Sequence, residues 1–132
     1  MDGRRVMTEK DLTEIHLKMD QWAAQCDGEF VVRLIDTFLA DAPKRLSALR
    51  RAFEQGAQVE LKRAAHTLKS SSGQLGITFY AEVAKSVELA AVAGGAVETA
   101  EPVQWLEDQF PDISAELQKL RGRFADAGVS SV

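Results

Sequence analysis

The sequence predicts an all-α protein, an antiparallel up-down four-helix bundle with an additional N-terminal helix. Apolar residues recur at three- and four-residue intervals along most of the chain, as in helices that bury one face. No segment gives a convincing strand pattern. Short loops between long amphipathic helices favour antiparallel neighbours. At 132 residues the chain has the length of one domain. We therefore expect a single domain over residues 1–132, with its bundle core at about 28–125.

The first predicted helix covers about residues 8–27, beginning near Thr8 and stopping before Gly28. Its apolar stripe consists of Leu12, Ile15, Met19, Trp22 and Cys26. We expect Cys26 to be a small apolar residue at the helix end. A single cysteine permits neither an internal disulfide nor a cysteine-based zinc cluster. His16 flanks the stripe with no lysine one turn on, so we expect a structural or solvent role for it.

The same periodicity continues from Val31 through Pro43 to Phe53. It predicts either two short helices that meet at Pro43 or one long helix that bends there. Gly56 is expected to end this segment. The next helix is expected from about Ala57 to Gln74 or Leu75.

Two more helices complete the predicted bundle. One covers about residues 77–92 and ends at the turn Gly94-Gly95. The other covers about residues 102–125, because proline is favoured in a first helical turn, and a bend is expected at Pro111. The tail, residues 128–132, is expected to fray.

His66 lies in the predicted helix that begins at about Ala57, on the side opposite its apolar stripe. At about 100° per residue, the exposed half surrounds the imidazole with cationic and small side chains. Its members are Val59, Lys62, Arg63, Lys69, Ser70 and Gly73. A neutral imidazole, with an ordinary pKa of about 6.5, can attack phosphorus and later release the phosphoryl group. Lys62 and Lys69 are placed to pair with phosphoryl oxygens. Ser70 and Gly73 leave room for a partner's active site.

Residues 65–76, Ala-His-Thr-Leu-Lys-Ser-Ser-Ser-Gly-Gln-Leu-Gly, closely resemble the signature of the histidine-containing phosphotransfer (HPt) family. In that signature His-x-Leu-Lys-Gly/Ser-Ser-Ser is followed by a Leu-Gly pair. Residues 34–49 look like the family's preceding helix, and Val87-Glu88 looks like its hydrophobic-Glu pair, so the resemblance covers about residues 28–93. Many members have Gly where this chain has Ser70. The extra hydroxymethyl group either narrows access or donates a hydrogen bond to the phosphoryl group.

Glu88 is a candidate for orienting the imidazole. If the chain reverses near Gly76, His66 lies about 10 residues before the turn and Glu88 about 12 after it. Both then stand about 15 to 18 Å from the bend. At that level a carboxylate could accept a hydrogen bond from one imidazole nitrogen and leave the other free. The resemblance supports this position, since family members have Glu or Gln near the histidine. The alternative is that Glu88 is a boundary residue in water.

The net charge of −4 is unevenly distributed. Between Lys44 and Lys69 there are seven basic and two acidic residues, a net charge of +5, and this region contains His66. We do not expect nucleic acid as a partner, because the whole chain is acidic and no aromatic residues alternate with the basic ones. An acidic protein partner fits better. The alternative is that these charges only solvate helix faces.

Several classes of function are excluded by what the sequence lacks. No apolar run approaches the 18 or so residues of a membrane span, and the first ten residues do not form a secretory signal, so we expect a cytoplasmic protein. A di-metal bundle needs Glu-x-x-His pairs, but Arg63 and Thr13 stand three residues before the two histidines. No phosphate-binding loop is present. The chain is therefore not expected to bind a metal or to phosphorylate itself from ATP.

The resemblance implies a phosphorelay intermediate of two-component signalling. His66 would accept a phosphoryl group from the aspartyl-phosphate of one receiver domain and transfer it to another. The partners would be receiver domains of response regulators or hybrid kinases, which would supply the divalent metal, and the chain would need no cofactor and act as a monomer. Because it begins at Met1 without kinase or receiver features, we expect a free-standing shuttle, with a domain of a longer kinase as the alternative. The rival functions are a non-catalytic adaptor that binds a response regulator and a module that dimerises.

Overall fold

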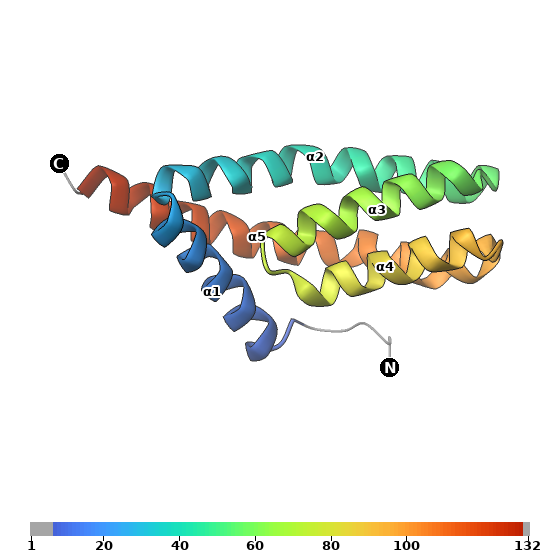
Figure 1. The fold of residues 1–132 in the computed structure, drawn as a ribbon, viewed down its shortest axis with the longest axis horizontal. Helices are drawn as coiled ribbons and strands as arrows, with labels where there is room; N and C mark the ends of the chain where they lie inside the picture. The colour runs from blue at the N-terminus through green and yellow to red at the C-terminus, as the bar shows by residue number, and fades with distance from the viewer. Residues whose placement is uncertain (1–6, 131–132) are drawn as a thin grey trace.

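A computed structural model describes residues 7–130, and within that range the chain is helical with no strand. The elements are α1 (Glu9–Gln25), α2 (Gly28–Gln55), α3 (Gln58–Gln74), α4 (Thr78–Val92), the short 3₁₀ helix η1 (Ala96–Thr99) and α5 (Ala100–Ser130). Successive long helices reverse direction, as Figure 1 shows for α2 to α5. The predicted all-α fold is confirmed.

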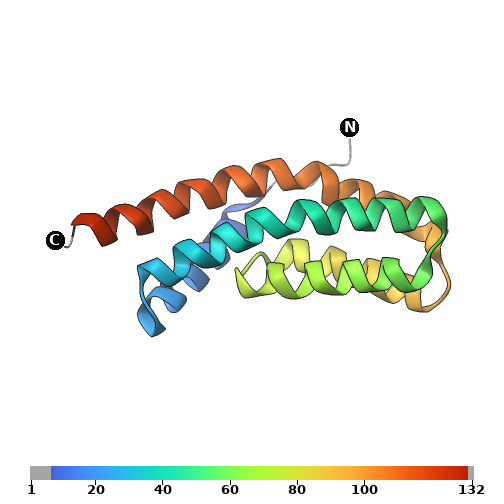
Figure 2. The same ribbon diagram turned by 90° about the horizontal axis from the view of Figure 1, so that it is seen from above.

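Helices α2 to α5 form a closed antiparallel bundle. α2 contacts both α3 and α5, and α4 contacts the same two helices, so each has two neighbours around one core. Figure 2 shows the same arrangement from above. The buried apolar side chains of all the helices belong to one cluster, which includes Ile35, Leu61, Tyr80 and Leu106. This is the predicted up-down arrangement, and it aligns α3 with α4 along their lengths.

The bundle combines one long pair of helices with one short pair. α2 and α5 have 28 and 31 residues, whereas α3 and α4 have 17 and 15. At 1.5 Å per residue, the long pair extends about 15 to 25 Å beyond the short pair. α1 lies across this extension near the α3–α4 turn (Figure 1), where Ile15 and Met19 are completely buried. The N-terminal helix therefore covers apolar surface that the short pair leaves open.

Local capping signals fix the start of α1 and α2. The Thr8 hydroxyl accepts from the backbone N–H of Asp11, and the Asp11 carboxylate accepts from the N–H of Thr8, which forms a capping box. Asp27 caps α2 through the N–H of Phe30. Gly56 ends α2 with a φ of 64°, in the left-handed region that favours glycine. These ends agree with the predicted boundaries to within a residue or two.

The prolines Pro43 and Pro111 lie inside the continuous helices α2 and α5. α2 continues through Pro43 as one long helix. Of the two arrangements that the sequence allowed, the pair of short helices is therefore absent. α5 starts at Ala100, two residues before the expected start at Pro102. Pro102 therefore lies in the first turn, where backbone N–H groups have no intrahelical partner and a missing N–H costs little.

Three predictions need correction. η1 was not expected after Gly94-Gly95. Cys26 caps the end of α1 but is exposed rather than packed as an apolar residue. α5 continues as a helix to Ser130, beyond the predicted end at about residue 125, and residues 131–132 lie outside the described residues.

Candidate functional site

His66 lies near the middle of α3 on its solvent face. The opposite face of α3 is fully buried at Leu61, Ala65 and Leu68, which anchor the helix in the core. A side chain five residues after Leu61 and one after Ala65 points away from that core at about 100° per residue. The His66 side chain is 58% exposed. The helix therefore presents an accessible imidazole, as the sequence predicted.

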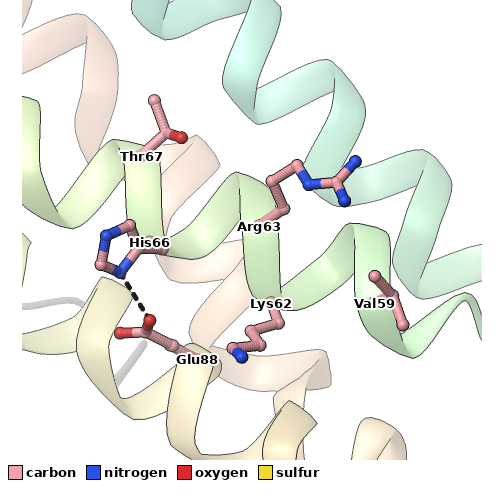
Figure 3. A pocket seen from close by; sticks show the side chains of 6 residues that line it. All are labelled: Val59, Lys62, Arg63, His66, Thr67 and Glu88. Atoms are coloured by element: carbon pink, nitrogen blue, oxygen red, sulfur yellow. Dashed lines mark hydrogen bonds and ion pairs between the residues drawn. The ribbon is translucent and has the colours of Figure 1, made fainter.

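Glu88 contacts one nitrogen of that imidazole from the neighbouring helix. Its Oε2 lies 2.7 Å from Nδ1 of His66, and Figure 3 shows the ring turned so that its other nitrogen, Nε2, points away from the carboxylate. An ionised carboxylate can only accept, so this contact places a proton on Nδ1. Nε2 of a neutral ring then carries the lone pair. The contact that the sequence suggested between α3 and α4 is present.

Lys69 holds the same carboxylate from the other side. Its Nζ donates to Oε1 of Glu88 at 2.8 Å, while the Glu88 side chain is only 12% exposed. The hydrogen bond from Lys69 lowers the pKa of Glu88 below its ordinary value, burial opposes this, and the contact with His66 lowers the pKa further. The sequence predicted that Lys69 pairs with phosphoryl oxygens, and it did not predict the hydrogen bond to Glu88. Spacing within α3 alone could not reveal a bond across to α4.

A hollow of about 410 Å³ opens beside the imidazole. It is lined by Val59, Lys62, Arg63, His66, Thr67 and Glu88 (Figure 3). Lys62 and Arg63 are exposed, and neither forms an ion pair with another described residue. Thr67 was not among the predicted site residues, because its place on the helix gave no chemical signal. The hollow thus places the imidazole beside two available cations.

The surface beyond His66 is shallow. Ser70 and Gly73 follow it on the exposed face of α3 and are themselves exposed. A Cβ placed on Gly73 would meet no atom within 4 Å, so packing within the chain does not require glycine there. Gly73 nevertheless weakens a helix interior by about 1 kcal/mol relative to alanine. Its use suits a surface that another molecule approaches closely.

The end of α3 is held by α1. The indole N–H of Trp22 donates to the backbone carbonyl of Gln74 at 2.7 Å. Gly76, with a φ of 75°, makes the turn into α4, and a Cβ there would lie 2.7 Å from Cβ of Lys18 and 2.8 Å from the carbonyl oxygen of Glu14. The contacts at Gly76 explain the glycine that ends the motif in structural terms. Helical periodicity alone did not indicate them.

The second histidine lies in a different setting. Nε2 of His16 lies 3.2 Å from Oε2 of Glu116, which joins α1 to α5. No group of His, Cys, Asp and Glu side chains in the described part of the chain could hold a metal ion. None of the described helices is long and apolar enough to span a membrane.

Comparisons with known proteins agree with this geometry. The family model of the Hpt domain matches residues 33–123. The fold is similar to the crystal structure of histidine-containing phosphotransfer protein B (HptB) from Pseudomonas aeruginosa PAO1, with a TM-score of 0.73. The two sequences are 24% identical, and the alignment covers 89% of this chain and 95% of the other. No curated protein matches the chain in sequence. The chain belongs to the Hpt domain family, and its role is histidine phosphotransfer in a phosphorelay.

Proposed function

We propose that His66 accepts a phosphoryl group from the aspartyl-phosphate of one receiver domain and passes it to the aspartate of a second. The observation that carries this proposal is the state of the imidazole. Nδ1 is bound to Glu88, whereas the side chain is 58% exposed and its other nitrogen points away from that carboxylate. A ring held in this way offers one nitrogen, Nε2, as the nucleophile.

The transfer step needs no proton to move. The Nε2 lone pair of His66 forms the bond to phosphorus, and the bond from phosphorus to the aspartyl oxygen breaks, with its electron pair leaving on the receiver's carboxylate. The imidazole keeps its Nδ1 proton and becomes positively charged. Glu88, 2.7 Å from Nδ1, stabilises that charge. The second transfer is the same step in reverse, with another receiver's carboxylate as the nucleophile.

The surroundings of His66 support docking of an acidic partner. Lys62 and Arg63 line the hollow without an ion pair to another described residue, so they are available to phosphoryl oxygens and to carboxylates around the receiver's aspartate. The exposed Val59, Leu89 and Val92 add apolar surface. The helices α3 and α4 that carry these residues are joined nearby, where Gln58 Nε2 donates to the carbonyl of Ala91. Ser70 and Gly73 leave the opposite side of the histidine shallow.

The chain supplies half of a composite active site. It provides a positioned nucleophile and cations, and the receiver would supply the acidic residues and the divalent ion that phosphoryl transfer requires. We propose no cofactor and no ATP-dependent kinase activity for the chain itself. It would act in the cytoplasm as a monomer that meets its receivers in turn.

The test is transfer from a phosphorylated receiver. Receiver domains from the genome that encodes this chain are phosphorylated with a radiolabelled donor and mixed with the wild type, with His66→Gln and with His16→Gln. We expect acid-labile, base-stable label on the wild type and on His16→Gln and none on His66→Gln. A labelled wild type should then pass its phosphate to a second, unphosphorylated receiver.

Other outcomes would contradict the proposal. Receiver binding that is equal for the wild type and His66→Gln, with no label on either, would indicate an adaptor. A mass that doubles with concentration and is unaffected by His66→Gln, again without label, would indicate a dimerisation module.

A further inference from the structure

The imidazole of His66 is turned toward the C-terminal half of α3. In Figure 3 the ring points away from both Lys62 and Arg63, along α3 toward its C-terminal end. Nδ1 is held by Glu88 at 2.7 Å, so Nε2 is the nitrogen that would carry a phosphoryl group. That group would therefore stand beside the next turn of α3, where Ser70 is exposed.

A cation of the neighbouring helix lies on the same side of the imidazole. Lys85 is exposed on α4, three residues before Glu88, and it forms no hydrogen bond or ion pair with another described residue. α3 and α4 are antiparallel neighbours, so the turn of α4 that precedes Glu88 lies beside the turn of α3 that follows His66. Lys69 also belongs to that turn of α3, but Glu88 holds its ammonium group at 2.8 Å. Lys85 is therefore available on this side, whereas Lys69 is not.

The position of Lys85 on its helix brings its ammonium group within reach of Nε2. At about 100° per residue, Lys85 and Glu88 differ by about 60° in direction, so both belong to the flank of α4 next to α3. They are about 4.5 Å apart along the helix axis. An extended lysine side chain carries its Nζ about 6 Å from its own Cα, which spans that separation.

The charges around Lys85 leave its ammonium group free for a new partner. Both oxygens of Glu88 are already bonded, Oε1 to Lys69 and Oε2 to His66. Glu82, three residues before Lys85, is exposed and forms no ion pair with it. A phosphoryl group on Nε2 brings up to two negative charges and three acceptor oxygens to this place. It would give Lys85 a partner that the described part of the unphosphorylated chain does not provide.

We propose that Lys85 binds the phosphoryl group once that group is on Nε2 of His66, so that α4 contributes a cation to the phosphorylated site. Lys62 and Arg63, on the side from which the ring points away, remain available to carboxylates of the receiver. The assignment rests on the proposed function of His66, but the contact belongs to the phosphorylated chain and can be measured whichever donor supplies the phosphate. Because Lys85 is exposed, we expect an effect of several-fold rather than a hundredfold.

Phosphorylated protein made without a receiver tests the contact directly. Phosphoramidate, a small donor that phosphorylates imidazole with loss of ammonia, is applied to the full chain in a His16→Gln background, so that His66 alone carries the group. The last proton of the phosphoryl group, which is lost at about pH 6, is titrated by the ³¹P chemical shift. The variants are Lys85→Met, Lys85→Arg and Lys119→Met. Lys119 is the matched control, because it is exposed on α5 and forms no ion pair with another described residue.

The expected titrations separate a contact from a distant charge. An ammonium group at the phosphoryl oxygens favours the dianion, so it lowers the pH of half-titration. We expect that pH to be about 0.5 higher in Lys85→Met than in the parent protein, which corresponds to about threefold weaker stabilisation of the dianion. Lys85→Arg and Lys119→Met should titrate like the parent, and salt at about 1 M should remove most of the difference. Equal titrations of Lys85→Met and Lys119→Met would overturn the proposal, and so would a parent protein that phosphoramidate does not phosphorylate.

Transfer from a receiver distinguishes binding of the phosphoryl group from docking of the partner. Lys85→Met should shift the equilibrium of the phosphoryl group about threefold toward the receiver, with no change in the half-saturating receiver concentration. Lys62→Met, which removes a cation that lines the hollow, should instead raise that concentration. If Lys85→Met raises only the half-saturating concentration, Lys85 contacts the receiver and the proposal is overturned. If no receiver phosphorylates the wild type, the proposed function fails, and the titration after phosphoramidate treatment still decides the role of Lys85.

Discussion

The two histidines of this chain make the same type of contact and yet present different chemistry. Each lies within hydrogen-bonding distance of a glutamate on another helix, His66 with Glu88 and His16 with Glu116. The difference is the nitrogen that is used. His66 binds its carboxylate through Nδ1, near the backbone, and His16 through Nε2, at the tip of the ring.

That difference decides which ring can serve as a nucleophile. In His66 the tip nitrogen is free on a 58% exposed side chain beside a hollow lined by cations. In His16 the tip nitrogen is occupied, the side chain is 39% exposed, and the contact fastens α1 to α5. A histidine-glutamate pair is therefore not by itself a reactive site. The register between the two helices determines which nitrogen remains available.

The largest effect should come from removing each imidazole in turn. His66→Gln is expected to abolish labelling by a phosphorylated receiver, because no other nitrogen occupies that position. His16→Gln is expected to leave labelling at the wild-type level, since its ring only joins two helices. Label that persists on His66→Gln and disappears on His16→Gln would reverse the assignment.

The two glutamates should differ by a smaller margin. Glu88→Gln is expected to slow transfer by about tenfold or more, because the imidazole loses the acceptor that orients it. Glu116→Gln is expected to leave the rate unchanged and to lower the free energy of unfolding by less than about 1 kcal/mol, as for other part-exposed pairs. Stopped-flow transfer kinetics and urea denaturation measure the two quantities. Equal rates for both variants would show that the contact with Glu88 has no role in transfer.

Glu88 should also make stability depend on pH. The pKa of Glu88 in the folded chain is lowered from its ordinary value of 4.5, chiefly by the hydrogen bond from Lys69. A lowered pKa gives stability that is present above pH 4.5 and is lost as the pH falls through the folded value. The wild type should therefore be more stable than Glu88→Gln at neutral pH, and the difference should shrink below pH 4.5.

Urea denaturation of both proteins at about pH 7 and about pH 3 checks this expectation. Other acidic groups, such as Asp36, are common to the two proteins and cancel in the difference. If the difference in the free energy of unfolding between the wild type and Glu88→Gln grows on acidification, the ion pair between Lys69 and Glu88 does not stabilise the fold.

The smallest effect concerns two glycines inside helices. At both Gly73 and Gly122, a Cβ would have no atom within 4 Å of it, so alanine fits at either position. Each substitution should raise the free energy of unfolding by about 1 kcal/mol through helix propensity. Gly73→Ala should also slow phosphoryl transfer several-fold, because its methyl group projects into the surface that a receiver approaches. Gly122→Ala, on α5, is the matched control and should transfer phosphate at the wild-type rate. Equal transfer rates for the two variants would show that Gly73 does not belong to the docking surface.

Much of the fold could be predicted because it depends on local signals. Apolar periodicity indicated the helices, Thr8 marked the start of α1, and Gly56 marked the end of α2. Local sequence could not show that α2 continues through Pro43 or that α5 begins before Pro102. Both outcomes depend on packing along whole helices. The short helix η1 has no apolar stripe to reveal it.

The site was predicted less evenly for the same physical reason. The exposure of His66 follows from periodicity within one helix, and the level of Glu88 follows from counting residues on either side of the turn at Gly76. The bond from Lys69 to Glu88 depends on the rotation of α3 against α4, which neither argument determines. The hold of Trp22 on the end of α3 depends on where α1 crosses the bundle. Contacts across helices therefore remained for the structure to reveal.

The most direct measurement is the position of the phosphoryl group on the ring. Protein labelled with ¹⁵N-histidine is phosphorylated by a receiver, and the coupling between ³¹P and ¹⁵N identifies the bonded nitrogen. The account predicts a bond to Nε2 of His66, with Nδ1 still protonated beside Glu88. Phosphate on Nδ1 of His66, or on either nitrogen of His16, would contradict it.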